Sequence, residues 1–235
     1  MAEFAKLRVG LAQINPTVGA LRENATKILD YYGQAADAGC DVVAFPELSI
    51  TGYPPEDLVL KQGFVAENQL VLGEIVKSIG ETYAVIGFVE QGQKSGELYN
   101  AAAICQNQKV VGVYRKHLLP NYNVFDEQRY FTPGIHNPLF NIKGACVGVT
   151  ICEDIWDSQG PVSVQASLGA VLNLNINGSP FHAGKQAERE VVVRAAVEAS
   201  GCAIVYANSV GGQDELVFDG GSMALDRSGR VGARL

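Results

Sequence analysis

The chain has 235 residues, of which 47% are hydrophobic and 18% are charged, and its formal net charge is −7 at pH 7. This composition is typical of a folded globular protein, and the length suits one domain with a substantial core. The acidic balance, without any run of Lys or Arg, argues against nucleic-acid partners and anionic membrane surfaces.

The beginning of the sequence, MAEFAKLRVGLAQI, lacks the apolar core and small-residue cleavage site of a signal peptide. No segment is long and apolar enough to predict a transmembrane helix. Four of the five cysteines lie in or beside apolar runs: Cys40, Cys105, Cys146 and Cys202. We therefore expect reduced thiols in a cytoplasmic protein, and the scattered histidines predict no metal site.

Apolar periodicity predicts alternating strands and helices in the first half of the chain. The predicted strands are 7–14, 41–47, 83–90, 98–106 and 110–116, and the predicted helices are 22–38 and 62–79. The last two strands form a hairpin across residues 107–109. Short apolar runs that alternate with helices are typical of sheets covered by helices, so we predict an α/β fold.

The second half repeats this order. It predicts strands at 146–152, 170–176 and 203–210, helices near 161–168 and at 185–200, and a hairpin within 221–235. The letters also correspond, since VGLAQI at 9–14 resembles VGVTIC at 147–152. We infer an internal duplication that gives two similar layered halves.

The polar, Gly-rich segment 211–222 is predicted to be a surface loop. Because the chain stops within or just after its last predicted hairpin strand, we expect a domain that is truncated at its C-terminal end. An uncovered edge strand invites pairing between chains, so we also expect a homo-oligomer.

Three reactive side chains are predicted at the carboxyl ends of strands: Glu47, Lys116 and Cys152. A carboxylate can take the proton of a thiol, and an ammonium can stabilise the thiolate and a developing oxyanion. Together they would form an acyl-transfer site without histidine, although each residue alone is more common as a core thiol or a surface charge. The sequence has neither the G-x-S-x-G of a serine hydrolase nor the G-x-G-x-x-G of a dinucleotide fold.

Three blocks occur in an order that resembles the nitrilase superfamily: FPELSITGYPPEDL, YRKHLLPNYNVFDEQRYFTPG and VTICEDIWD. Two further stretches, NINGSPFHAGKQAERE and GGQDELVFDGGSMALDRSG, resemble the glutamine-amidotransferase domain of glutamine-dependent NAD+ synthetases. The resemblance runs from about residue 7 to the end of the chain. It implies a four-layer α-β-β-α sandwich, which agrees with the inferred duplication.

The resemblance also implies roles for individual residues. The catalytic positions fall on Glu47, Lys116, Cys152 and a second glutamate, Glu127, and the glutamine-binding positions fall on Tyr122, Ser179 and Lys185. Glutamine carries both charges, so Lys185 could face its carboxylate, and Glu127 or Glu153 could face its ammonium. Aromatic side chains could line its methylenes: Tyr53, Tyr122 and Trp156. Ordinary core packing is an equal alternative for Tyr53 and Trp156.

The resemblance implies that residues 1–235 form a glutaminase domain that hydrolyses L-glutamine through a Cys152 thioester. The ammonia would serve a synthetase domain that amidates deamido-NAD+. The sequence lacks that domain and its SGGxDS motif. ATP and Mg would belong to the synthetase domain, and we expect no cofactor in this chain. A stand-alone amidase or carbamoylase, and a non-catalytic domain that docks a synthetase, are the alternatives.

Overall fold

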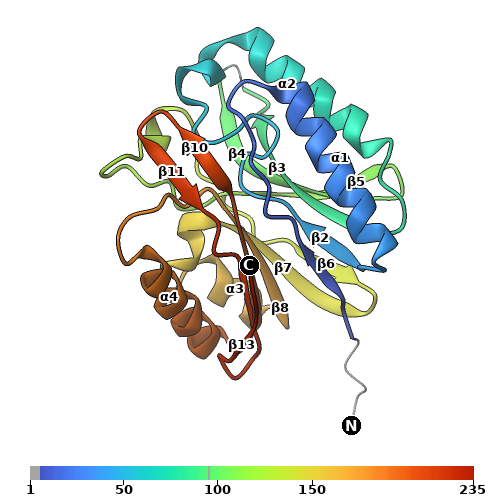
Figure 1. The fold of residues 1–235 in the computed structure, drawn as a ribbon, viewed down its shortest axis with the longest axis vertical. Coiled ribbons are helices and arrows are strands. Elements are labelled where there is room, and N and C mark those ends of the chain that lie inside the picture. The colour runs from blue at the N-terminus through green and yellow to red at the C-terminus, as the bar shows by residue number, and fades with distance from the viewer. Residues whose placement is uncertain (1–5, 95) are drawn as a thin grey trace.

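The computed structural model describes residues 6–94 and 96–235, which form two β-sheets with helices on their outer faces (Figure 1). The first half contains β1 (Val9–Leu11), α1 (Leu21–Asp37), β2 (Val42–Ala44), η1 (Glu56–Leu60), α2 (Gln62–Val76), β3 (Tyr83–Gln91), β4 (Leu98–Gln106) and β5 (Lys109–Arg115). A short helical turn, η2 (Glu127–Arg129), lies in the connection to the second half.

The second half contains four helical or strand elements before α4: β6 (Leu139–Ile142), β7 (Ala145–Ile151), α3 (Pro161–Ser167) and β8 (Leu172–Asn177), with the turn η3 (Cys152–Ile155) directly after β7. It continues with α4 (Lys185–Ser200), β9 (Ala203–Asn208), β10 (Val210–Gln213), β11 (Leu216–Asp219), β12 (Met223–Leu225) and β13 (Val231–Arg234).

The strand order confirms the predicted duplication. The first sheet has the order β1-β2-β3-β4-β5, and the second has the order β13-β12-β9-β8-β7-β6. In both halves three parallel strands are followed by two antiparallel ones. The registers also correspond, because Val9 pairs with Val42 as Val147 pairs with Leu172.

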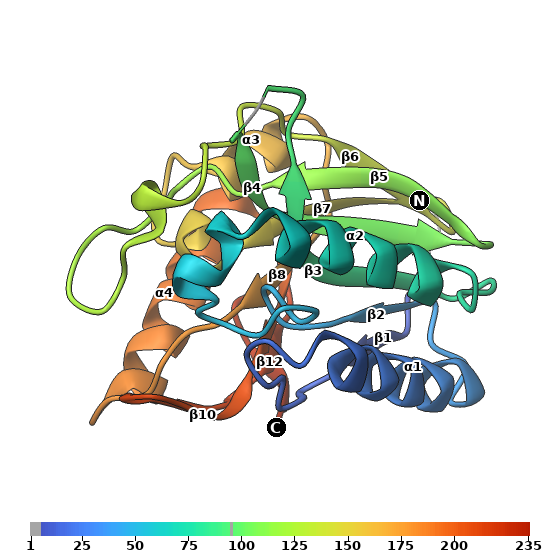
Figure 2. The same ribbon diagram turned by 90° about the horizontal axis from the view of Figure 1, so that it is seen from above.

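Four layers result from the way the strands alternate their side chains. Apolar residues of α1 and α2 pack on the outer face of the first sheet, and those of α3 and α4 pack on the second. Between the sheets, Val85 of β3 and Val149 of β7 belong to one buried cluster. Figures 1 and 2 show the two pairs of helices on opposite sides of the stacked sheets, as the predicted α-β-β-α sandwich requires.

Two regions of the chain differ from the prediction. The segment 211–222 was expected to be a loop, but most of it forms the antiparallel ribbon of β10 and β11. Leu216 and Phe218 point inward while Val217 and Asp219 are exposed, and this alternation stabilises the ribbon. The second difference is β6, an unpredicted strand that pairs with β7 at the sheet edge.

The predicted strands 7–14 and 41–47 are shorter in the structure, because the chain leaves the ladder after Leu11 and Ala44. Both segments continue toward the same end of the sandwich, where the N–H of Ala12 still donates to the carbonyl of Ala44 at 3.0 Å. No helix within residues 6–94 and 96–235 combines the length and apolar character needed to cross a membrane.

Candidate active site

Glu47, Lys116 and Cys152 all lie just beyond strand ends. Glu47 follows β2, Lys116 follows β5 directly, and Cys152 begins the turn η3 directly after β7. The site is therefore assembled from both sheets. Cys152 has a φ of 43°, a left-handed conformation that is uncommon for a residue with a side chain and often marks functional sites.

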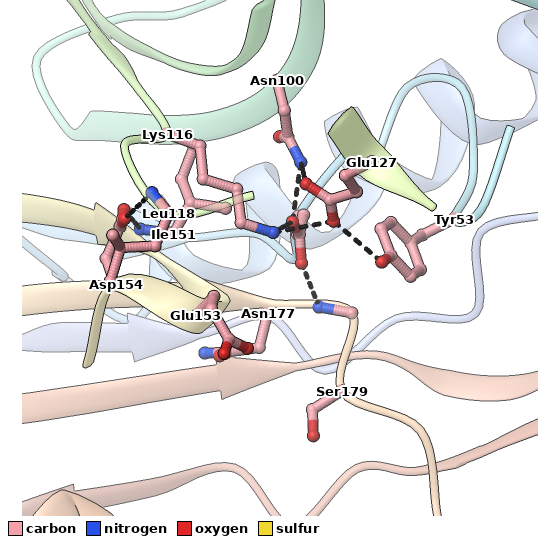
Figure 3. A network of polar contacts seen from close by, with 12 residues as sticks. Tyr53, Asn100, Lys116, Leu118, Glu127, Ile151, Glu153, Asp154, Asn177 and Ser179 are labelled. Carbon is pink, nitrogen blue, oxygen red and sulfur yellow. Dashed lines mark hydrogen bonds and ion pairs between the residues drawn. The ribbon is translucent and has the colours of Figure 1, made fainter. Parts of the chain in front are cut away.

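A buried ion cluster joins three of the predicted catalytic side chains: Glu47, Lys116 and Glu127. The Lys116 Nζ lies 2.7 Å from Glu47 Oε1 and 2.7 Å from Glu127 Oε1, and all three side chains are almost completely buried. Figure 3 shows Lys116 pointing toward Glu127, with Asn100 and Tyr53 around them. The ion pairs fix the Lys116 ammonium in a site where charge interactions are strong.

The Glu47 carboxylate is held on both oxygens. Asn100 Nδ2 donates to Oε1 at 2.7 Å, in addition to Lys116, and the N–H of Gly178 donates to Oε2 at 2.8 Å. Gly178 belongs to the segment after β8, so the second sheet orients a carboxylate that the first sheet supplies. A carboxylate fixed in this way has little freedom to turn away from a reacting thiol.

Charge and burial set the protonation of the cluster. Burial alone would lower the pKa of Lys116, but Glu127 and Glu47 outweigh it and hold that pKa well above its usual value. Burial raises the pKa of Glu127 to about 7, against the opposing effect of Lys116. Burial, reinforced by the charge of Glu47, also raises the pKa of the Cys152 thiol well above its usual value. The resting sulfur is therefore a neutral thiol that needs a base.

Cys152 opens onto a cavity of about 380 Å³, a size suited to a small molecule. Six of the residues that the sequence singled out line it: Tyr122, Cys152, Glu153, Trp156, Ser179 and Lys185. Glu215 and Leu216, at the turn and start of the β10–β11 ribbon, complete part of the wall. The ribbon that replaced the predicted loop thus contributes directly to the candidate site.

The cavity presents both charge signs. The hydroxyl of Tyr122 donates to Glu153 Oε1 at 2.8 Å. The Lys185 Nζ lies 3.2 Å from Glu188 Oε2 and 4.3 Å from the centre of the Trp156 ring, so the indole face supports the ammonium. An amino acid with its two charged groups would find partners for both.

Two of the predicted substrate contacts lie elsewhere. Tyr53 was expected either to line the methylenes of a substrate or to pack in the core; it packs in a buried cluster, and its hydroxyl donates to Glu127 Oε1 at 2.8 Å. Glu127 was considered as a partner for a substrate ammonium, but Lys116 and Tyr53 occupy its carboxylate. Neither residue lines the cavity that contains Cys152. Their contacts place both in support of Lys116.

Residues that the sequence reasoning did not select also build the site. Asn100 stands in the otherwise apolar stretch NAAAIC of β4 and bonds Glu47. Arg189 is completely buried, and its guanidinium donates to Ser179 Oγ at 3.2 Å and to Asp219 Oδ1 at 2.7 Å. In the sequence, Arg189 could have been recognised as a charged residue on the apolar face of α4, four residues before Val193.

Known proteins share this architecture. The chain is 45% identical over 231 residues to a glutamine-dependent NAD(+) synthetase of Thermotoga maritima, covering 96% of this chain and 39% of that protein. It is 44% identical over 235 residues to the synthetase of the same name from Xylella fastidiosa, covering 98% of this chain and 42% of that protein. The chain thus spans about two fifths of the length of these relatives.

Solved structures agree. A glutamine-dependent NAD+ synthetase of Acinetobacter baumannii superposes with a TM-score of 0.93 at 37% identity, over 97% of this chain and 43% of that one. An amidase from Nesterenkonia sp. has the same fold, with a TM-score of 0.86 at 22% identity, over 99% of this chain and 87% of that one. A family model described as carbon-nitrogen hydrolase matches residues 8–235. The chain therefore belongs to the carbon-nitrogen hydrolase family.

Proposed function

We propose that this chain hydrolyses the side-chain amide of L-glutamine through a thioester on Cys152. The observation that carries the proposal is the position of Cys152 on the wall of a cavity that presents both charge signs. The second sheet supplies Cys152, and the first sheet supplies the buried Glu47–Lys116 pair. The raised pKa of the thiol requires a base, and the fixed Glu47 carboxylate is suited to that role.

The reaction begins when Glu47 takes the proton of Cys152 as the sulfur attacks the side-chain carbonyl carbon of glutamine. The Lys116 ammonium and the main-chain N–H that follows Cys152 stabilise the oxyanion of the tetrahedral intermediate. The C–N bond then breaks, and Glu47 returns the proton to the leaving ammonia. A γ-glutamyl thioester remains on Cys152.

Water completes the cycle. Glu47 accepts a proton from a water molecule as its oxygen attacks the thioester carbonyl, and the second tetrahedral intermediate again forms its oxyanion near Lys116. The C–S bond breaks, glutamate leaves, and the thiol regains its proton from Glu47. No net proton or electron is gained or lost by the protein.

The charged cavity residues account for the choice of an amino-acid amide. Lys185 binds the α-carboxylate and Glu153 binds the α-ammonium, while the hydroxyls of Tyr122 and Ser179 add polar contacts. Trp156 also lines the cavity, and its ring face supports the Lys185 ammonium. A plain aliphatic amide would leave these charged groups without partners, which lowers its affinity.

We further propose that the ammonia serves a synthetase domain. The relatives named glutamine-dependent NAD(+) synthetase are more than twice as long as the matched region, which supports a division of labour in the whole protein. The synthetase domain would use ATP and Mg²⁺ to activate deamido-NAD+, and the ammonia would then displace the activating group. No step of that second reaction involves the residues of this cavity.

Ammonia release from glutamine, asparagine and propionamide tests the proposal. We expect kcat/KM for glutamine to exceed the others by on the order of 10²-fold or more. Cys152→Ala should abolish the activity, and Cys105→Ala, which changes a buried thiol of β4, should retain it. Equal turnover of propionamide would favour a stand-alone amidase instead. Glutamine binding without ammonia release from any amide would favour a non-catalytic docking domain.

A further inference from the structure

Asp154 is a completely buried carboxylate two residues beyond the nucleophile, in the turn η3. It does not line the cavity, and the proposed reaction assigns no step to it. We propose that Asp154 is a positioning residue that ties the turn of Cys152 to the segment of Lys116. This inference rests on the proposed function for the catalytic roles of Cys152 and Lys116, whereas the link between their segments consists of four hydrogen bonds.

Each oxygen of Asp154 accepts two of these bonds. The main-chain N–H groups of His117 and Leu118 donate to Oδ1 at 3.1 and 2.9 Å. The N–H of Ile151 and the hydroxyl of Tyr114 donate to Oδ2 at 3.0 and 2.7 Å. Figure 3 shows the hydrogen bonds that join the Asp154 carboxylate to Leu118 and Ile151. A buried carboxylate with four donors is fully satisfied, so its position is sharply defined.

The donors on Oδ2 and Oδ1 belong to the two catalytic segments. Ile151 directly precedes Cys152, and its bond to Asp154 closes the turn in which Cys152 adopts a φ of 43°. His117 and Leu118 directly follow Lys116. One carboxylate therefore links the end of β7 in the second sheet to the end of β5 in the first. The spacing between the sulfur and the ammonium depends on this link.

The bonding pattern requires a carboxylate rather than an amide. All four partners donate hydrogen bonds, so the NH₂ of an asparagine would face two donors in either orientation. Burial raises the pKa of Asp154, while the N–H of Leu118 and the hydroxyl of Tyr114 oppose that shift. Asp154→Asn changes few atoms but removes two of the four hydrogen bonds, so it tests the link directly.

The experiment compares Asp154→Asn with Asp157→Asn, a matched change at an exposed aspartate three residues further along. We expect Asp154→Asn to lower kcat on the order of 100-fold, since a displacement of about 1 Å can have that effect, with KM changed less than about threefold. Hydrogen exchange should accelerate in peptides that cover 114–120 and 148–156 and remain unchanged elsewhere. Asp157→Asn should match the wild type in both measurements.

The kinetics use whichever amide the wild type hydrolyses, so failure of glutamine as the substrate would overturn the proposed function and leave this test intact. A folded Asp154→Asn with wild-type kcat and wild-type exchange overturns the positioning role. So does a rise in KM alone. If Asp154→Asn does not fold, Tyr114→Phe removes one of the four donors. We then expect kcat to fall about five- to tenfold at constant KM, and an unchanged kcat overturns the proposal.

Discussion

Lys116 places a positive charge between the carboxylates of Glu47 and Glu127, at 2.7 Å from each. A lysine without such partners would lose its charge on burial, and the surrounding carboxylates prevent that loss. The same arrangement explains how the site can work without histidine. In the proposed mechanism the base is a carboxylate fixed by Asn100 and Gly178, and the oxyanion partner is an ammonium that stays charged.

The residues assigned to the amino-acid head should affect binding more than bond making. Ser179→Ala, Tyr122→Phe and Lys185→Ala are each expected to raise KM for glutamine roughly 10- to 100-fold, which corresponds to the loss of a hydrogen bond to a charged group. The alkylation rate of Cys152 with iodoacetamide should change little. Steady-state kinetics and alkylation measure the two effects separately. A fall in kcat at constant KM would contradict the assignment.

The raised pKa of Glu127 predicts how the free energy of unfolding depends on pH. Its pKa rises from an ordinary 4.5 to about 7 in the folded protein. Below pH 4.5 the group is protonated in both states. Between pH 4.5 and 7 the unfolded chain releases this proton while the folded one keeps it, so the free energy of unfolding falls as pH rises. Above about 7 this loss is complete.

Glu127→Gln cannot titrate and should show a flatter change in stability between pH 4.5 and 7. Urea unfolding at pH 5 and pH 7.5 measures the difference. Glu198→Gln, an exposed change on α4, should retain the wild-type slope. Identical slopes for the wild type and Glu127→Gln would show that Glu127 does not titrate in this range.

Several site residues were recognisable in the sequence because they end apolar runs, as Glu47 and Cys152 do. The substrate contacts considered for Tyr53 and Glu127 were not found, because Glu127 binds Lys116 across 11 positions and Tyr53 across 74 positions, and such contacts cannot be read from the sequence. Asp154 follows Glu153 in the block VTICEDIWD, but the sequence does not show that its carboxylate binds the segment after Lys116, 36 positions away along the chain.

Gly87 of β3 shows how a strand can position Glu47, the proposed base, on the neighbouring segment. A Cβ at Gly87 would lie 2.3 Å from the nitrogen of Leu48 and 2.5 Å from the carbonyl oxygen of Pro46. A glycine within a strand often marks such a close approach of another backbone. The turn that presents Glu47 therefore rests directly on this strand.

Gly87→Ala should displace that turn. We expect a loss of stability of about 1–3 kcal/mol from overpacking and a large fall in kcat because Glu47 moves. Gly73→Ala on α2 is the control, since a Cβ there meets no atom within 4 Å apart from the helix's own backbone. It should be neutral or stabilise by about 0.5–1 kcal/mol. Urea unfolding measures the stability of both variants, and steady-state kinetics measures their kcat. Full activity of Gly87→Ala would contradict the role given to β3.

Helices and central strands were predictable because their apolar patterns extend over many residues, as in α1 and β4. The β10–β11 ribbon was not, because Gly211, Gly212 and Gly220 are typical of loops. Its four-residue strands acquire their stability from two side chains, Leu216 and Phe218, that pack against the core. A pattern of that length cannot be distinguished from a connector without the surface it covers.

The duplication arranges the whole molecule so that the carboxyl ends of β2 and β7 meet at one end of the sandwich. It also leaves β13 at the edge of the second sheet. An exposed edge offers unpaired backbone groups to another chain. We therefore predict that the protein self-associates through β13.

Sedimentation velocity tests this prediction. The wild type should sediment as a species larger than 25.1 kDa. Ala233→Lys, which places a charge on the exposed edge of β13, should shift the distribution toward the monomer. Ala195→Lys on the exposed face of α4 serves as the control and should leave it unchanged. A monomeric wild type, or equal effects of both variants, would contradict association through this edge.

The central claim is that Cys152 is the nucleophile of a site shaped for glutamine. Mass spectrometry after treatment with 6-diazo-5-oxo-L-norleucine, an electrophile with the shape of glutamine, tests both halves at once. We expect one adduct per chain, on Cys152, which glutamine suppresses and Cys152→Ala abolishes. An adduct on Cys40, Cys105, Cys146 or Cys202 with Cys152 unmodified would contradict the account.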